Sequence, residues 1–127
     1  TLICDNNGNC YVLDYIVRTL RKISRGGESS TVIRFPYDQF AGSDWYESKL
    51  AYDALRNVLY ITKEDTIGII DMEGTVSTWK TSLTRLRGIC VDREGTVFVS
   101  TSSGQIYSTD PEKREMKQIL QNTGVVF

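Results

Sequence analysis

The sequence has no histidine and only two prolines among its 127 residues. Without an imidazole, His-containing zinc sites and His-based general-base or triad catalysis have no carrier. A CxxC pair is absent, and so is an Asn-x-Ser/Thr glycosylation acceptor. There is also no hydrophobic run long enough to span a membrane as a helix, and no signal-peptide pattern. We therefore expect no metal site, no cofactor and no membrane partner.

Cysteine is scarce, and charge of either sign is not in excess. The formal net charge is −1, and basic residues are interspersed with acidic ones, which disfavours a polyanion-binding protein. Cys4, Cys10 and Cys90 lie in predicted strands, and we expect three buried free thiols. Cys4 and Cys10 would face each other across a hairpin, where a bridge is usually strained. Unpaired thiols without a glycosylation acceptor favour a reducing compartment, so we predict an intracellular, cytoplasmic protein.

One pattern occurs three times in the chain. The run DREGTVFVST at 92–101 matches DALRNVLYIT at 53–62 without a gap, at a period of 39 residues. After a further shift of 48 residues, DNNGNCYVLD at 5–14 matches the same stretch. The last four residues, GVVF at 124–127, resemble GICV at 88–91. The chain is therefore a repeat protein that ends at the start of a fourth unit.

Each repeat has the pattern of four short strands. The first strand (LIC, LAY or GICV) is apolar on both faces, which is typical of a strand buried on both sides. It ends at an Asp whose carboxylate we expect to accept a backbone N–H and set a turn, and a Gly then supplies positive φ in the first and third repeats. Strands rich in β-branched and aromatic residues follow, and the fourth strand is more polar. We predict purely structural turn roles for Asp5, Asp53, Asp92, Gly8 and Gly95.

Four-stranded units at a period near 40 are typical of a β-propeller. We predict an all-β chain, a propeller segment of three four-stranded antiparallel blades that belongs to a six-bladed ring. The expected parts are blade 1 at 1–35, an insert at 36–47, blade 2 at 48–80, blade 3 at 87–121 and the start of a fourth inner strand at 124–127. Because two blade faces would be uncovered, we expect the ring to be completed by the rest of a longer chain or by a second copy.

The run GICVDREGTVFVSTSSGQIYSTD at 88–110 resembles the NHL repeat. In that repeat an apolar pair and an Asp precede a turn ending in Gly, then an apolar strand and a short loop into a further strand. The likeness covers nearly the whole chain outside residues 36–47. It implies an NHL-like propeller, a class that includes protein scaffolds, RNA binders and enzymes, so the resemblance predicts the fold more strongly than the function.

The insert is the largest departure from the repeat. It joins the outer strand of one blade to the inner strand of the next, a connection on the same propeller face as the loop between the second and third strands. We call this the top face; it comprises residues 14–19, 36–47, 62–66, 81–86 and 101–104. The aromatic and acidic side chains of the insert are of the kind found in recognition surfaces. Its aromatic side chains could instead pack against the blades and hold the loop in place. We predict partner-binding roles for Tyr37, Phe40, Trp45 and Tyr46, with Arg85 and Arg87 at the rim.

These features favour a non-catalytic scaffold that binds a protein partner on the top face. RNA binding is an alternative, because Arg18, Lys49 and Lys63 add basic groups, but acidic neighbours would weaken the attraction of phosphates. A second alternative is a six-bladed hydrolase or lactonase whose catalytic residues lie outside this segment, since the inner strands carry no carboxylate at their top ends. On balance we expect no enzyme and no catalytic residue in this chain.

Overall fold

The structure is a computed structural model that describes residues 1–14, 17–35 and 48–120. These residues form three separate four-stranded antiparallel sheets, each with its strands in sequence order. Blade 1 contains β1 (Leu2–Cys4), β2 (Cys10–Asp14), β3 (Thr19–Ile23) and β4 (Ser29–Arg34). Blade 2 contains β5 (Leu50–Asp53), β6 (Val58–Lys63), β7 (Thr66–Ile70) and β8 (Val76–Lys80). Blade 3 contains β9 (Leu86–Val91), β10 (Val97–Thr101), β11 (Ile106–Thr109) and β12 (Met116–Leu120). The predicted all-β propeller segment is confirmed.

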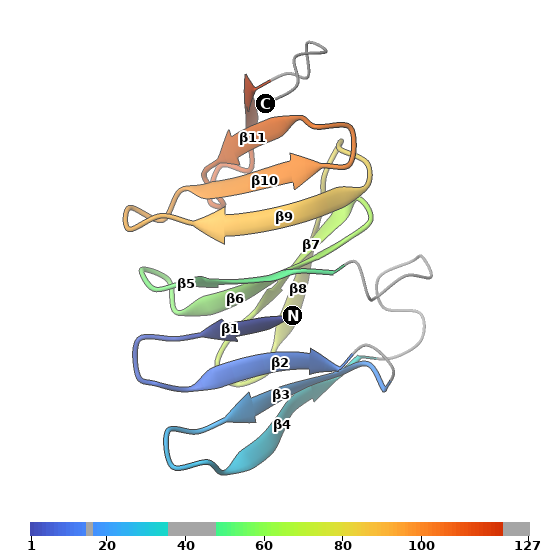
Figure 1. The fold of residues 1–127 in the computed structure, drawn as a ribbon. Helices are drawn as coiled ribbons and strands as arrows, with labels where there is room; N and C mark the ends of the chain where they lie inside the picture. The colour runs from blue at the N-terminus through green and yellow to red at the C-terminus, as the bar shows by residue number, and fades with distance from the viewer. Residues whose placement is uncertain (15–16, 36–47, 121–127) are drawn as a thin grey trace.

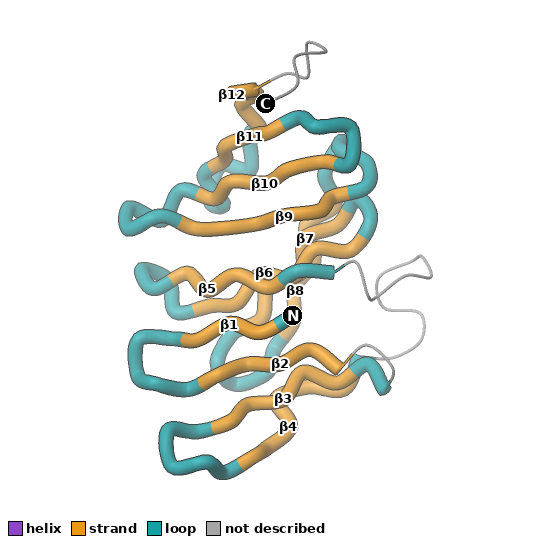
Figure 2. The backbone as a smooth tube through the Cα atoms, viewed as in Figure 1, coloured by secondary structure: helices purple, strands orange, loops and turns teal. Residues whose placement is uncertain are grey.

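The three blades radiate from their inner strands. Strands β1, β5 and β9 lie next to one another, and the other strands of each blade extend away from them (Figure 1). The turns after the inner strands, which we call the bottom rim, lie at one end of the strands, and the described top-face loops lie at the other (Figure 2). No helix occurs in the described ranges, and thus none that could cross a membrane. The predicted insert at 36–47 and the predicted strand start at 124–127 lie outside the described residues.

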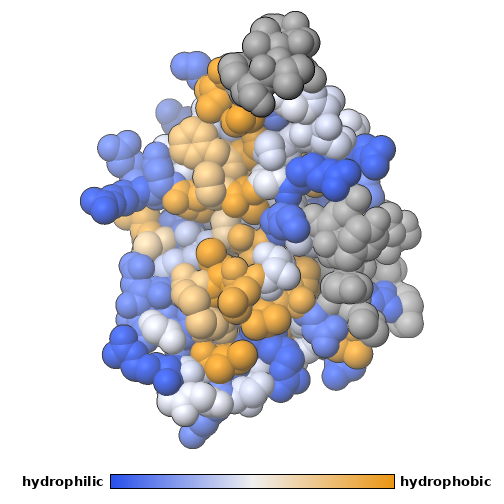
Figure 3. Space-filling view, viewed as in Figure 1, coloured by the Kyte–Doolittle hydropathy of each residue, from blue (hydrophilic) through white to orange (hydrophobic). Residues whose placement is uncertain are grey.

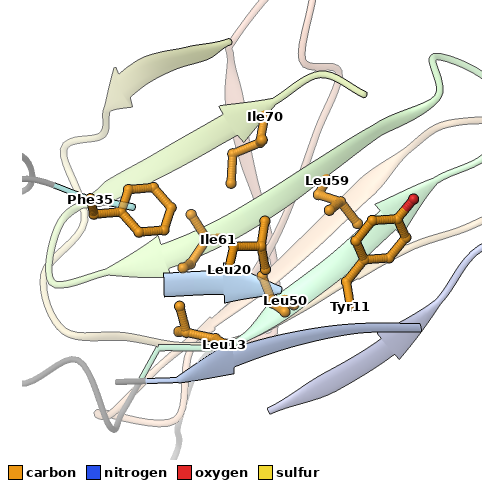
Figure 4. Packing of buried hydrophobic residues seen from close by; sticks show 8 residues of the cluster. All are labelled: Tyr11, Leu13, Leu20, Phe35, Leu50, Leu59, Ile61 and Ile70. Carbon is orange, nitrogen blue, oxygen red and sulfur yellow. The ribbon is translucent and has the colours of Figure 1, made fainter. Parts of the chain in front are cut away.

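The core lies between the blades. Strand β6 shows why, because its side chains alternate between two neighbours: Leu59 and Ile61 pack toward blade 1, and Tyr60 packs toward blade 3. The cluster between blades 1 and 2 contains Tyr11, Leu13, Leu20, Phe35, Leu50, Leu59, Ile61 and Ile70 (Figure 4). The cluster between blades 2 and 3 contains Tyr60, Ile67, Trp79, Leu83, Leu86, Val97 and Val99. Among the described residues, blade 2 is therefore covered on both faces, whereas blades 1 and 3 are each covered on one.

The inner strands of the outer blades are less buried than their sequences predict. Leu2 is 61% exposed and Cys4 is exposed, because they alternate with Ile3, which packs against the core between blades 1 and 2. Cys90 is likewise exposed on the uncovered face of blade 3. Apolar atoms consequently gather on the surface around β1 (Figure 3). The prediction of three buried thiols was wrong, since an apolar strand is buried on both sides only where a blade follows on each side.

The repeats do not match without a gap. In blade 2, Asp53 pairs with Val58, so four residues form the turn. In blade 3 the Asp92 N–H donates to the Thr96 carbonyl, which leaves three residues in the turn. Tyr60 therefore corresponds to Phe98, one residue earlier than the gapless match would place it. This difference matters because a slip of one residue moves every side chain of a strand to the other face.

The aspartates at the bottom rim accept backbone hydrogen bonds. In blade 1, Asp5 Oδ1 accepts the N–H groups of Asn7 and Asn9 at 2.8 and 3.0 Å. In blade 3, Asp92 Oδ1 accepts those of Glu94 and Thr96, both at 2.9 Å. The turns end in left-handed backbone, with φ of 84° at Gly8, 54° at Asn57 and 82° at Gly95. Glycine adopts this conformation readily and Asn tolerates it, which fits the residue type found at each position.

Candidate functional site on the top face

The top-face loops are joined by backbone hydrogen bonds. The Leu86 N–H donates to the Glu64 carbonyl at 2.8 Å, and the Ser102 N–H donates to the Arg85 carbonyl at 3.0 Å. The connection from blade 2 to blade 3 is therefore held between the β6–β7 turn and the β10–β11 loop. In blade 1, the Phe35 N–H donates in the same way to the Arg18 carbonyl at 2.9 Å. These hydrogen bonds therefore fix the backbone positions from which the loop side chains extend.

Three non-glycine residues of the top face have left-handed backbone. Their φ angles are 52° at Arg18, 54° at Glu64 and 54° at Arg85. This conformation costs energy for residues with a Cβ, and such residues cluster at binding and catalytic sites. Glu64 is half-buried and Arg85 is exposed, so both lie where a bound molecule could reach them. The site therefore combines a carboxylate and a guanidinium on a constrained main chain.

Polar side chains also support the strand ends below these loops. The Lys49 N–H donates to Thr62 Oγ1 at 3.1 Å, and the Gly88 N–H donates to Ser100 Oγ at 3.0 Å. Each bond ties the start of an inner strand to the second strand of its blade. At the end of β6, Lys63 is 2% exposed. A lysine is seldom so buried, which makes Lys63 a further candidate residue under the top face.

Of the residues predicted to bind a partner, the structure describes the two arginines but not the four aromatic residues. The aromatic residues Tyr37, Phe40, Trp45 and Tyr46 lie outside the described residues. Arg85 is exposed on the top face beside the turn that contains Glu64, and Arg87 is half-buried in β9. The sequence predicted a role for Arg85 but not for Glu64. It did not predict the left-handed backbone of either residue, because nothing in an isolated Lys-Glu-Asp or Thr-Arg-Leu segment reports backbone conformation.

At the bottom rim, Asp53 does more than form a turn. Its side chain is 0% exposed and accepts hydrogen bonds from the Tyr60 hydroxyl at 2.7 Å, from the Arg56 N–H at 3.0 Å and from Arg56 Nη1 at 2.9 Å. Burial by itself would raise the pKa of Asp53, but these hydrogen bonds outweigh it and the pKa lies below its ordinary value. The pKa of Tyr60 is raised, first by burial and then by the Asp53 carboxylate.

Arg56 connects blades 2 and 3. Its Nη1 donates to the Gly95 carbonyl at 2.8 Å, and its guanidinium lies 3.5 Å from a carboxylate oxygen of Asp110 and of Glu112. A Cβ at Gly95 would lie 2.6 Å from Arg56 Nη1, so a larger residue would displace the guanidinium, and the positive φ of Gly95 also favours glycine. The sequence analysis missed this contact. The longer turn of blade 2, which contains Arg56, was the available signal.

The other two turn aspartates lack such a bridge. The Tyr11 hydroxyl donates to Asp5 Oδ2 at 3.0 Å, and burial, then this hydrogen bond, raise the pKa of Tyr11 to about 12. Burial tends to raise the pKa of Asp5, but hydrogen bonds from Asn9, Asn7 and Tyr11 lower it overall. Blade 3 has Phe98 at the corresponding place, so Asp92 has no ring hydroxyl to bind and is exposed. The three aspartates therefore share a turn position but differ in burial and partners.

The described residues contain no cluster of three or more Cys, Asp or Glu side chains that could hold a metal ion. The described residues of the top face thus offer separate charged groups. Glu64 can accept a proton or a hydrogen bond, and Arg85 can bind an anionic or carbonyl oxygen.

Three radiating antiparallel blades with cores between them define a segment of a β-propeller. No protein-family model matches the chain, and no curated protein matches its sequence. Among solved structures, it is similar to virginiamycin B lyase from Staphylococcus aureus, with a TM-score of 0.71 and 15% identity over 93% of the chain. It is similar to a streptogramin B lyase with a TM-score of 0.70 and 12% identity over 96% of the chain.

A third solved structure has the same local fold in a much longer protein. The extracellular domain of BT4673, assigned to a one-component system of B. thetaiotaomicron, gives a TM-score of 0.63 and 21% identity. This match covers 94% of the chain but only 15% of that protein. The chain also spans only 39% and 40% of the two lyases. These similarities confirm the propeller fold and do not distinguish an NHL-type repeat from other propeller repeats.

The prediction that the protein is not an enzyme must be corrected. Two of the solved structures that share its fold over nearly the whole chain are lyases. The prediction relied on the absence of histidine and of a nucleophile motif from three blades. Because the chain spans only about two-fifths of those lyases, the absence of these groups from three blades does not exclude catalysis.

Proposed function

We propose that the chain is part of a catalytic β-propeller of the lyase or hydrolase type, with its substrate bound on the top face. The observation that carries the proposal is the similarity to two lyases over 93% and 96% of the chain. The NHL-like pattern is compatible with it, because that class of propeller includes enzymes.

In this proposal the segment binds and orients the substrate, and other blades supply the acid–base groups. Arg85 is exposed on the top face and its main chain is hydrogen-bonded to Ser102, so it can hold an anionic or carbonyl oxygen in a defined place. Glu64 lies in the adjoining turn and can accept a hydrogen bond from the same substrate. Arg87, half-buried in β9, adds positive charge near the start of the inner strand.

We also propose that further blades cover the open faces of blades 1 and 3, from a longer chain or from a second copy, in a ring for which six blades remain our prediction. The support is that blade 2 buries both of its faces against neighbours, while Leu2 and Cys90 are exposed on the outer blades. Size exclusion with light scattering on the 127-residue chain tests this. A monodisperse monomer that binds no hydrophobic dye would contradict it.

The catalytic proposal is tested by incubating the intact protein with streptogramin B and with a panel of esters and lactones. The molecular masses of the products are then measured by mass spectrometry. A lyase cleaves its substrate without adding water, whereas a hydrolase adds one water. Arg85→Ala should lower kcat/KM by about 10-fold or more, the scale expected on losing an oxygen-binding group.

Lys117→Ala is the matched control, because Lys117 is an exposed cation on the outer strand β12, away from the top face. It should leave kcat/KM unchanged. If no compound in the panel is converted, or if Arg85→Ala and Lys117→Ala have equal effects, the proposed activity or the proposed site is wrong.

A further inference from the structure

Two cysteines of blade 1 face each other across the first hairpin. Cys4 in β1 pairs with Cys10 in β2, and their Sγ atoms lie 2.7 Å apart. The hydrogen bond with Cys4 raises the pKa of the Cys10 thiol, with smaller contributions from burial and from the Asp5 carboxylate. The strand register, and not a flexible loop, therefore brings the two thiols together.

The pair occupies a position of the hairpin that can be bridged. The Asp5 N–H donates to the Asn9 carbonyl, and the Leu13 N–H donates to the Thr1 carbonyl. Because hydrogen-bonded and non-hydrogen-bonded pairs alternate along antiparallel strands, Cys4 and Cys10 form a non-hydrogen-bonded pair. The Cα atoms of such a pair are about 4.5 Å apart, at the short end of the range that disulfides span. A disulfide fits here without moving the strands apart.

The two thiols lie on the face of blade 1 that no described blade covers, so they can react while that face is open, before the further blade proposed above docks on it. Cys4 is exposed and Cys10 is half-buried, on the opposite face of the sheet from the core between blades 1 and 2. The third thiol has a different setting, because Cys90 pairs with Phe98 and is exposed on blade 3. The register therefore allows one intramolecular bridge and leaves Cys90 as a control within the same chain.

We propose that Cys4 and Cys10 form a reversible disulfide, through exchange with a low-molecular-weight disulfide such as oxidised glutathione, that fixes β1 to β2. One cysteine thiolate attacks the small disulfide, releases one thiol and forms a mixed disulfide. The other cysteine then attacks the protein sulfur of that mixed disulfide and releases the second thiol. The cysteines lose two electrons and two protons in total, and the small disulfide is reduced to two thiols.

The bridge acts on the shortest strand of the blade. Strand β1 has only three residues, and its Leu2 is 61% exposed. A disulfide at the short end of the allowed geometry, on an accessible face, is also reduced more easily than a buried structural one. The pair thus couples the thiol–disulfide balance of the surroundings to the order of the innermost strand of blade 1.

The test uses the 127-residue chain with Cys90→Ser, in which no further blade of a longer chain covers β1. It is equilibrated in mixtures of reduced and oxidised glutathione, then alkylated and mapped by peptide mass spectrometry. We expect both remaining cysteines to lose their reactivity together, with no glutathione retained, and to regain it in excess dithiol. Hydrogen exchange at the β1 amides should slow by about tenfold or more in the oxidised protein, because local opening becomes less frequent. The wild-type chain should give the same bridge, with Cys90 modified separately.

The paired variant Cys4→Ser/Cys90→Ser is the control, in which Cys10 should retain one glutathione and the β1 amides should exchange as in the reduced protein. The proposal is overturned if Cys4 and Cys10 stay alkylatable or each retain glutathione under native conditions. A bridge that forms only after addition of denaturant would overturn it too. A bridge that leaves hydrogen exchange at the β1 amides unchanged would also overturn the proposal, because the order of the strand would then not depend on the bridge.

Discussion

The junction between blades 1 and 2 and the junction between blades 2 and 3 have similar apolar cores, but they differ in polar contacts. At the second junction Arg56 reaches from blade 2 to Gly95, and Arg114 lies 5.5 Å above the Trp79 ring. At the first junction Tyr11 donates a hydrogen bond to the Met72 sulfur at 3.4 Å, which is a weaker acceptor. Apolar burial therefore supplies the attraction at both junctions, and charged contacts additionally fix how blades 2 and 3 meet.

The largest effect should come from removing core volume at a junction. Leu59→Ala should lower the free energy of unfolding by about 2–5 kcal/mol, because Leu59 is 0% exposed between blades 1 and 2. In the isolated 127-residue chain, the matched change Leu2→Ala, at a side chain that is 61% exposed, should cost less than about 0.5 kcal/mol. Chemical denaturation of both variants checks this. Similar losses for the two would mean that a second copy of the chain already covers the open face of blade 1.

A smaller effect should separate two aspartates that the sequence treats as equivalent. Asp53→Ala should cost about 3 kcal/mol, because it leaves Arg56 and the Tyr60 hydroxyl without their carboxylate partner. Asp92→Ala should cost about 0.5–2 kcal/mol, the scale of losing a side-chain cap on backbone N–H groups. Thermal and chemical unfolding provide the measurement. If Asp92→Ala left the Tm unchanged but abolished activity or binding, its assigned turn role would be wrong.

Trp45 lies in the insert, outside the described ranges. If Trp45 is part of a binding surface, Trp45→Ala should weaken the binding of a protein partner by about 1–2 kcal/mol and leave the unfolding free energy nearly unchanged. Titration calorimetry and denaturation measure the two quantities separately. A loss of about 3–5 kcal/mol in stability would instead make Trp45 a core residue.

The smallest effect should be a loss of stability at acidic pH. The folded-state pKa values of Asp5 and Asp53 lie below the ordinary 3.8, so their stabilising contribution is fully present above that pH and is lost as pH falls through the folded values. Stability should thus decline below about pH 4, and the decline should be shallower in Asp53→Ala than in the wild type. Urea denaturation at a series of pH values measures it. Equal slopes in the two proteins would mean that other carboxylates dominate.

The sequence predicted the parts of the fold that are local. The repeated Asp, the Gly or Asn that follows it and the runs of β-branched residues identify hairpins, and hairpins in series identify blades. The gapless match failed at the turn of blade 2, because alternating apolar strands match one another almost equally well when shifted by one residue. Tyr60 and Phe98 could be aligned only once the strand pairing was known.

The long-range contacts could not be predicted in this way. The bond from Arg56 to Gly95 joins residues 39 positions apart and depends on how two blades meet. The exposure of Leu2 and Cys90 depends on which blade faces are covered, which no pattern within one repeat reports. For the same reason, the sequence identified Arg85 as a basic loop residue, while its place beside Glu64 emerged only from the structure.

The polar contacts between blades 2 and 3 lie at both ends of their strands, with Arg56 and Gly95 at the bottom rim and Glu64 and Leu86 on the top face. Two attachment points separated along the strands resist torque, whereas a single one would act as a pivot. Blades 2 and 3 should therefore transmit an applied force as one rigid body. Among the described residues, blade 1 is joined to blade 2 mainly by apolar contacts, which can slide past one another. On these contacts, we expect blade 1 to separate first under mechanical load.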